Sequence, residues 1–264
     1  MSKKIIINGA AGRMGRRLMV LGSAQPEIEI VQAIDYAAHP LQGHPFRELE
    51  PTLDTALPLS AELTADADVM IDFSVPDSTV TRARIAAEKG IALVIGTTGM
   101  TAEQEEVIRS LSRQIPVIHA ANYSLGVNLM VKIAAKIAQV LGDDFNIEIT
   151  EAHHNRKVDA PSGTALSLAK GICAAIGRDA GSDLVHGRQG RPGARTKKEI
   201  GMHSLRMGSV VGDHTVFFGS DFERLELTHR AETRDVFAAG ALRAALWLAG
   251  KKPGFYTMAD VLEI

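Results

Sequence analysis

Short apolar runs alternate with longer helical segments in the first half of the chain. A helix is predicted from Pro76 to Lys89, because proline suits the first helical turn and Gly90 suits the position after the last one. Thr101 and Gln104 have the spacing of a capping box at the start of a further helix. The apolar runs predict buried strands at Lys3–Asn8, Ile28–Ile34, Asp68–Phe73, Ile91–Ile95 and Ile115–Ile118. Such alternation is typical of a parallel sheet whose strands are joined by crossover helices.

The pattern changes after residue 124. A long apolar helix is predicted from about Val127 to Leu141, and Phe145, Ile147 and Ile149 then alternate with polar residues, as in a half-exposed strand. The later pattern predicts strands at Ile200–Leu205, Ser209–Phe218 and Leu225–His229, and a last helix from Arg234 to Leu248 that ends near Gly250. These segments predict a second, α+β domain with an open mixed sheet.

The first strand runs into a glycine-rich turn, Gly9-Ala10-Ala11-Gly12-Arg13-Met14-Gly15, which is followed by an apolar helix. Glycines allow the backbone to approach a pyrophosphate, whose charge then meets the N–H groups at the helix start. The second strand ends at Asp35, about twenty residues after the turn, where an acid can accept hydrogen bonds from the adenosine ribose. The segment predicts an α/β, Rossmann-type dinucleotide-binding domain. A plain glycine turn is the alternative, since one extra residue separates the first two glycines.

A second chemical signal lies in residues 151–164, which contain two adjacent histidines, a lysine and a Pro-Ser-Gly-Thr helix entry. The side chains of His154 and Lys157, with backbone N–H groups around Gly163-Thr164, can hold carboxylates through charge and helix-terminus donors. His153 is then left for proton transfer, because an imidazole exchanges protons near neutral pH. A solvated basic loop is the alternative, although charge alone does not require adjacent histidines before a helix. The segment predicts a site for a small acid.

Composition narrows the class of protein. The 264 residues include 29 basic and 31 acidic side chains, a net charge of −2, which gives no sign of nucleic-acid binding. Met1-Ser2-Lys3-Lys4 runs directly into the first strand, and no apolar run approaches membrane-spanning length. We therefore expect no signal peptide, no membrane segment and a cytoplasmic location.

Cysteine and histidine usage argues against thiol and metal chemistry. Cys173 is the only cysteine, which excludes an intramolecular disulfide, and its apolar surroundings predict a buried residue. The adjacent histidines lack a third ligand at helical spacing, so no metal site is expected. His203, His214 and His229 fall on predicted strands, where packing roles are commoner, and are left outside the site.

The stretch between Gly177 and Lys198 is the one loop-like segment, rich in glycine and arginine, including Arg188, Arg191 and Arg195. A mobile flap and a solvated connection fit this composition equally well, and both stay open.

Several motifs in order along the chain resemble the 4-hydroxy-tetrahydrodipicolinate reductase (dihydrodipicolinate reductase) family. The resemblance runs from the first strand to the final helix. Its motifs are the glycine turn Gly9–Gly15, Gly96-Thr97-Thr98-Gly99, Asn122-Tyr123-Ser124 with Gly126-Val127-Asn128, the histidine segment, Glu199–Ser204, and Val211–Val216.

The resemblance implies that NADH or NADPH reduces (2S,4S)-4-hydroxy-2,3,4,5-tetrahydrodipicolinate to tetrahydrodipicolinate with loss of water, in the diaminopimelate route to lysine. It implies a dinucleotide-binding domain of residues 1–124 and 233–264, closed by the C-terminal helix. Residues 125–232 would form a substrate-binding and oligomerisation domain, and the protein would be a homotetramer.

The family's functional positions can be placed on this sequence. Proton transfer falls on His153 and Lys157, and contacts to the substrate carboxylates fall on His154, Gly163 and Thr164. Coenzyme contacts fall on Gly9, Ala10, Ala11, Gly12, Arg13, Met14, Asp35, Gly96, Thr97, Thr98, Ala120, Ala121, Asn122 and Tyr123.

The chain departs from the family pattern at two places. Met207, in Arg206-Met207-Gly208, stands where a glycine is usual, and the turn Gly219–Glu223 is altered. Both are expected to lie outside the site. Two other functions stay open: a related reductase that acts on a different small acid, and a nucleotide sensor without catalysis.

The residues after the second strand favour one coenzyme. Asp35 should repel a 2′-phosphate, and Tyr36 stands where a basic residue often supports it. NADH is therefore predicted to serve at least as well as NADPH, unless Arg13 or Arg16 compensates.

Overall fold

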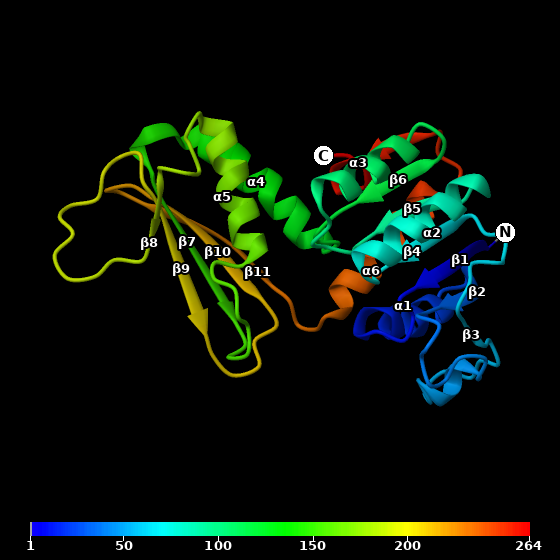
Figure 1. Cartoon of the computed structure of the whole chain (residues 1–264). Coiled ribbons are helices and arrows are strands. Elements are labelled where there is room, and N and C mark those ends of the chain that lie inside the picture. Colours follow the sequence, from blue (N-terminus) through cyan, green and yellow to red (C-terminus); the bar gives the residue numbers. More distant parts are fainter. Residues whose placement is uncertain (1) are drawn as a thin grey trace. The chain divides into compact units, whose positions relative to one another are not determined.

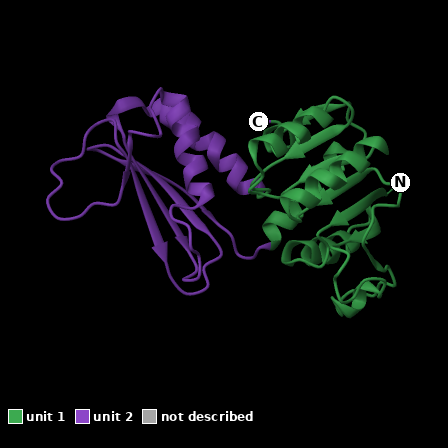
Figure 2. Cartoon of the chain, viewed as in Figure 1, with its two compact units in different colours: residues 1–124, 235–263 green, residues 125–234, 264 purple. Residues whose placement is uncertain are grey.

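Figure 1 shows the computed structural model, which describes residues 2–264. The chain divides into two compact units (Figure 2). The first contains the described residues up to Ser124 together with Asp235–Glu263, and the second contains Leu125–Arg234 and Ile264.

A seven-stranded sheet forms the centre of the first unit, and all its strand pairs are parallel. The strand order is β12-β6-β5-β4-β1-β2-β3. The strands are β1 (Lys3–Asn8), β2 (Ile28–Ile34), β3 (Leu59–Ser60), β4 (Val69–Asp72), β5 (Ala92–Ile95), β6 (Pro116–His119) and β12 (Gly254–Tyr256). The helices are α1 (Arg13–Ser23), the 3-10 helix η1 (Phe46–Glu48), α2 (Pro76–Glu88), α3 (Ala102–Leu111), α6 (Asp235–Leu248) and α7 (Met258–Leu262).

The order of the strands locates a binding crevice. From β1 the chain moves outward to β2 and β3, whereas β4, β5 and β6 extend the sheet in the opposite direction (Figure 1). The order therefore reverses between β1 and β4. In doubly wound sheets, ligands bind beyond the carboxyl ends of the strands at this reversal.

Apolar strands and small helix residues explain why these elements assemble. β4 and β5 are buried along their whole length, as central strands covered on both faces are. In α6, Gly240 lies so close to the segment after β6 that a Cβ there would be 1.8 Å from the Tyr123 carbonyl oxygen. A glycine at this position lets α6 pack into the first unit.

The second unit is a mixed five-stranded sheet with two helices against one face. The strand order is β11-β10-β7-β9-β8; β7 is parallel to β9 and antiparallel to β10. The elements are α4 (Leu125–Leu141), the 3-10 helix η2 (Gly142–Asp144), β7 (Asn146–His153), α5 (Gly163–Ile176), β8 (Leu184–His186), β9 (Ile200–Arg206), β10 (Asp213–Gly219) and β11 (Arg224–Arg230).

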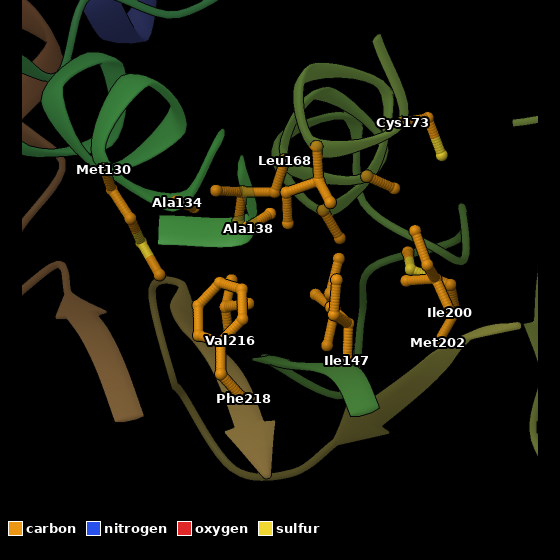
Figure 3. Close-up of a cluster of buried hydrophobic side chains, with 14 residues drawn as sticks. Met130, Ala134, Ala138, Ile147, Leu168, Cys173, Ile200, Met202, Val216 and Phe218 are labelled. Carbon is orange, nitrogen blue, oxygen red and sulfur yellow. The ribbon is translucent and has the colours of Figure 1, made fainter. Parts of the chain in front are cut away.

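One apolar core joins the helices to this sheet (Figure 3). Met130, Ala134 and Ala138 come from α4, Leu168 and Cys173 from α5, and the strands contribute further residues to the same cluster. The strand residues labelled in the figure are Ile147, Ile200, Met202, Val216 and Phe218. The opposite face of the sheet carries polar residues such as Glu148 and His203, which are only partly buried. Cys173 is 2% exposed, as predicted.

Several predicted boundaries are wrong. The strand predicted from Ser209 begins only at Asp213, because Gly208 has φ +48° and the residues after it form a turn. The stretch 177–198 is not entirely loop, since β8 pairs in parallel with β9. The structure after Gly250 was not predicted: β12 extends the first sheet beside β6, and α7 follows it.

The apolar segment Leu125–Asp144 also corrects the sequence prediction. Its 20 residues are long and apolar enough to cross a membrane by length and composition, whereas no run of that length was expected. Its Met130, Ala134 and Ala138 lie in the core of the second unit, and 22% of the segment is buried. Other large apolar side chains of the same helix, such as Leu129 and Val140, are exposed.

Candidate active site

The glycine turn after β1 is shaped by close backbone approaches. Gly9 has φ +77°, and a Cβ there would be 2.5 Å from the Phe73 carbonyl oxygen. A Cβ on Gly15 would be 2.0 Å from the Gly9 carbonyl oxygen, so α1 starts directly against the turn. Gly12 is the N-cap of α1 and provides no side-chain cap. The turn therefore leaves helix-terminus N–H donors beside a bare backbone, which suits a pyrophosphate.

A cavity of about 530 Å³ lies where the ends of β1, β2 and β4 meet. Its lining includes Gly9, Ala11, Gly12 and Asp35 from the predicted coenzyme site. Asp35 accepts a hydrogen bond from the Ala11 N–H at 2.7 Å and another from the Tyr36 N–H at 2.9 Å. The Asp35 carboxylate therefore fixes the backbone of the turn and also forms part of the cavity wall. The rest of the lining is Asn8, Tyr36, His39, Phe73, Ser74, Val75 and Ser78.

The remaining predicted coenzyme residues do not line this cavity. Ala10, Arg13 and Met14 belong to the same turn and first helical turn. Gly96, Thr97 and Thr98 follow β5, and Ala120, Ala121, Asn122 and Tyr123 follow β6. β5 is adjacent to β4, and β6 is adjacent to β5. Both segments therefore follow the carboxyl ends of parallel strands, the edge of the sheet at which ligands bind.

Two of these side chains have structural roles. The Thr97 hydroxyl is buried and donates to Asp72 at 2.9 Å. The Tyr123 hydroxyl donates to the Ile95 carbonyl at 2.8 Å, and burial raises the pKa of Tyr123 well above its usual value. If Thr97 or Tyr123 contacts a coenzyme, its backbone atoms therefore make the contact.

A buried carboxylate organises the crevice side of the first sheet. Asp72, at the end of β4, is fully buried and accepts from the Asn8 amide at 2.8 Å and the Ser74 hydroxyl at 2.7 Å as well as from Thr97. These bonds tie the ends of β1, β4 and β5 together. Sequence reasoning missed Asp72, although an acid at the end of a buried strand was a visible signal.

The histidine segment of the second unit begins at the end of β7. His153 is the last residue of β7, and its Nδ1 lies 2.5 Å from Oε2 of Glu151. Lys157 donates from Nζ to Asp159 at 2.8 Å, and its backbone N–H bonds to the His154 carbonyl. Side-chain Nδ1 of His154 is buried and, in the described part of the chain, has no hydrogen-bond partner. The other ring nitrogen of His154, Nε2, lies 3.4 Å from a guanidinium nitrogen of Arg234.

The helix entry lies directly after this turn. Ser162 is the N-cap of α5, and its hydroxyl accepts from the Ala165 N–H at 3.2 Å. Gly163 and Thr164 form the first turn of that helix, where donors for an anion are expected. The structure therefore brings His153, His154, Lys157, Gly163 and Thr164 into one loop and helix start.

Three residues that the sequence prediction left out surround His153. Glu151 is 1% exposed and binds both guanidinium nitrogens of Arg206 at 2.8 Å. The His214 ring packs edge-on against the His153 ring, with centroids 5.2 Å apart, and its Nε2 lies 3.0 Å from the Ser162 hydroxyl. Burial lowers the pKa of His214 to about 4, so this imidazole is neutral at neutral pH.

The position of Arg206 corrects one expectation. The segment Arg206-Met207-Gly208 was expected to lie outside the site. However, Arg206 binds Glu151, the carboxylate that contacts His153, and the Met207 N–H donates to the His153 carbonyl at 2.9 Å. The pairing of His153 with Arg206 across β7 and β9 causes this proximity. No group of three or more histidine, cysteine, aspartate or glutamate residues suited to a metal ion occurs within residues 2–264.

The first unit is a doubly wound sheet with a glycine turn of the dinucleotide-binding type, and the second unit carries proton-exchanging side chains. Dinucleotide-dependent dehydrogenases and reductases combine these two features. Two family models match the two parts of this chain separately. The model described as dihydrodipicolinate reductase, N-terminus, matches residues 3–123, and the model described as dihydrodipicolinate reductase, C-terminus, matches residues 126–262. The chain belongs to the dihydrodipicolinate reductase family, whose members are NAD(P)H-dependent oxidoreductases.

Individual relatives agree with the family models. The chain is 47% identical over 265 residues to 4-hydroxy-tetrahydrodipicolinate reductase of Magnetococcus marinus, which covers 99% of each chain. It is 45% identical over 266 residues to the enzyme of the same name from Pseudomonas fluorescens, again covering 99% of each. A dipicolinate-bound dihydrodipicolinate reductase from Paenisporosarcina sp. TG-14 has the same fold, with a TM-score of 0.77, 24% identity, and coverage of 98% of this chain and 99% of that one.

Proposed function

We propose that this chain reduces 4-hydroxy-tetrahydrodipicolinate to tetrahydrodipicolinate, with NAD(P)H and one proton consumed and NAD(P)⁺ and water released. The observation that carries the proposal is the histidine segment. It joins a proton-exchanging imidazole and an ammonium to a helix N-terminus within one loop. A dicarboxylate that must also accept a proton needs this combination of donors.

The first unit would hold the coenzyme. The Gly9–Gly15 turn fits a pyrophosphate, and Asp35 faces the cavity in which ribose hydroxyls can donate to it. When bound, the reduced nicotinamide supplies the hydride. The Asp72 network keeps the ends of the strands in place, so that the residues after β5 and β6 are presented on a rigid edge.

The second unit would hold the substrate and move the proton. His154, with an unpartnered Nδ1, and the Gly163 and Thr164 N–H groups would bind the carboxylates. His153 would deliver the proton, and Lys157 would share anchoring and proton transfer. Asp159 holds the Lys157 ammonium at 2.8 Å in this structure, and a carboxylate of the substrate would compete with it.

We also propose that the protein assembles as a homotetramer. The open face of the second sheet carries Glu148 and His203, and Arg188 and Arg195 from the 177–198 stretch bind Glu148 there at 2.8 and 3.4 Å. This face is the surface through which a homotetramer would form. Sedimentation at working concentration should give four chains, whereas a stable monomer would contradict it. A small polar substrate and coenzyme agree with a cytoplasmic reaction, which we also propose.

One assay separates the proposed activity from its alternatives. Oxidation of NADH is followed by its absorbance with freshly generated 4-hydroxy-tetrahydrodipicolinate, and in parallel with other small oxo acids. The proposal predicts turnover of the first substrate only. Turnover of another acid alone would indicate a related reductase, and NADH binding with no turnover of any substrate would indicate a sensor.

A further inference from the structure

Glu151 is a buried carboxylate for which every bonding position is supplied by the second unit. Arg206 donates to both carboxylate oxygens at 2.8 Å, and the Ser162 N–H donates to Oε1 at 3.2 Å. Nδ1 of His153 lies 2.5 Å from Oε2, and the Ser204 side chain also donates a hydrogen bond to the carboxylate. An acid this enclosed is costly to keep charged unless its partners are fixed. The arrangement therefore holds the carboxylate in one orientation.

The charge on Glu151 decides which His153 nitrogen carries a proton. Burial alone would raise the pKa of Glu151, but hydrogen bonds, chiefly from Arg206 and His153, outweigh it and lower that pKa to about 2. An ionised carboxylate accepts hydrogen bonds and donates none. Because Glu151 stays ionised across the working pH range, Nδ1 of His153 must be the donor in this pair.

The other ring nitrogen faces a different environment. A Cβ on Gly212 would be 3.1 Å from Nε2 of His153, so a glycine keeps that side of the ring uncrowded. His214 covers the ring edge-on and is neutral. The other titratable groups on the loop beside it are His154, Arg156, Lys157 and Asp159. Nε2 is thus the ring atom left for exchange with a ligand.

We infer that Glu151, clamped by Arg206, is a positioning residue that keeps a proton on Nδ1 of His153 and makes Nε2 the atom that gives its proton to the substrate. The inference rests on the proposed role of His153 in proton transfer. In the step, the N–H bond at Nε2 breaks, a bond from that hydrogen to the substrate forms, and a neutral imidazole with its proton on Nδ1 remains. Arg206 keeps Glu151 from taking the Nδ1 proton, because its two donors stabilise the charged carboxylate.

Glu151→Gln tests this directly, because it keeps the shape of the side chain and removes its charge. We expect kcat to fall by about 10- to 100-fold with KM for the substrate changed by less than about threefold. We also expect the pH profile of kcat to differ from that of the parent, because the ring loses its anionic neighbour. In the free protein, ¹⁵N spectra should show His153 with its proton on Nδ1 in the parent and a mixture of tautomers in the variant.

The chain offers a matched control on the same strand. Glu148 also pairs with an arginine and a histidine, Arg188 at 2.8 Å and His203 at 2.7 Å, but lies on the open face of the sheet. Glu148→Gln should leave the pH profile and the His153 tautomer as in the parent, with the assembly state checked by sedimentation. Arg206→Lys, which keeps one positive charge but loses the paired donors, should give a smaller effect in the same direction and serves if Glu151→Gln does not fold.

The outcomes distinguish the inference from the proposed function. A Glu151→Gln enzyme with the parental pH profile and His153 tautomer would overturn the role of Glu151, even if His153→Ala is inactive. If His153→Ala is fully active, the role of His153 fails, whatever the tautomer measured in the free protein.

Discussion

Gly15→Ala should damage coenzyme binding through backbone displacement alone. A Cβ at this position would be 2.0 Å from the Gly9 carbonyl oxygen and 2.5 Å from the Ala10 Cα, whereas ordinary contact begins at 3.4 Å. The turn must therefore move by roughly 1.4 Å, because neither neighbour is a flexible side-chain end. Overpacking of this kind costs about 1–3 kcal/mol, and alanine's better helix propensity returns only about 1 kcal/mol.

The displaced turn is the one expected to meet the pyrophosphate. If the strain appears in the bound state, the dissociation constant for NADH should rise by about 5- to 150-fold, as measured by calorimetric titration. Gly22→Ala is the matched control on the same helix, since its Cβ would meet only the ends of the Ile30 and Leu242 side chains at 3.1 and 3.3 Å. Gly22→Ala should bind NADH nearly as the parent does. Parental affinity in a folded Gly15→Ala protein would refute the assignment of the turn to the pyrophosphate.

Three further predictions follow from buried or charged groups. NADH should serve at least as well as NADPH, and Asp35→Ala should lower kcat/KM for NADH more than for NADPH; a strong parental preference for NADPH in steady-state kinetics would contradict the role of Asp35. His214 has its pKa lowered from 6.5 to about 4 by burial, so the unfolded chain binds a proton that the folded chain does not. Its contribution to the free energy of unfolding should fall by about 3 kcal/mol from pH 7 to pH 4, and urea titrations of His214→Gln should lack that part of the slope. Asp72→Asn should destabilise the first unit by about 2 kcal/mol or more, because the amide cannot accept all the donors that meet the carboxylate; an unchanged urea midpoint would argue against this network.

The sequence predicted the long elements of the fold because their apolar patterns are strong. Runs such as Ile91–Ile95 must be buried on both faces, which favours a parallel sheet with helices around it. β3, β8 and β12 have only two or three residues, too few for any periodicity to show. Their strand character comes from pairing with β2, β9 and β6, which no local pattern contains.

The same distinction between local patterns and long-range pairing applies to the residues of the candidate site. Residues of a linear motif, such as His153 and Lys157, are visible in one stretch of sequence. Glu151 was within reach, because alternation along a strand places it on the same face as His153. Arg206 is 55 residues from Glu151 and reaches it only through the register of β7 with β9. His214 likewise lies opposite Glu151 across β7 and β10.

The most direct test of the account is the activity of His153→Ala measured together with its affinity for NADH. The proposed proton transfer predicts that kcat falls by about 10²- to 10⁴-fold at every pH, while the dissociation constant for NADH stays nearly unchanged, because the glycine turn lies in the other unit. A His153→Ala enzyme that turns over 4-hydroxy-tetrahydrodipicolinate at close to the parental rate across the pH range would contradict it.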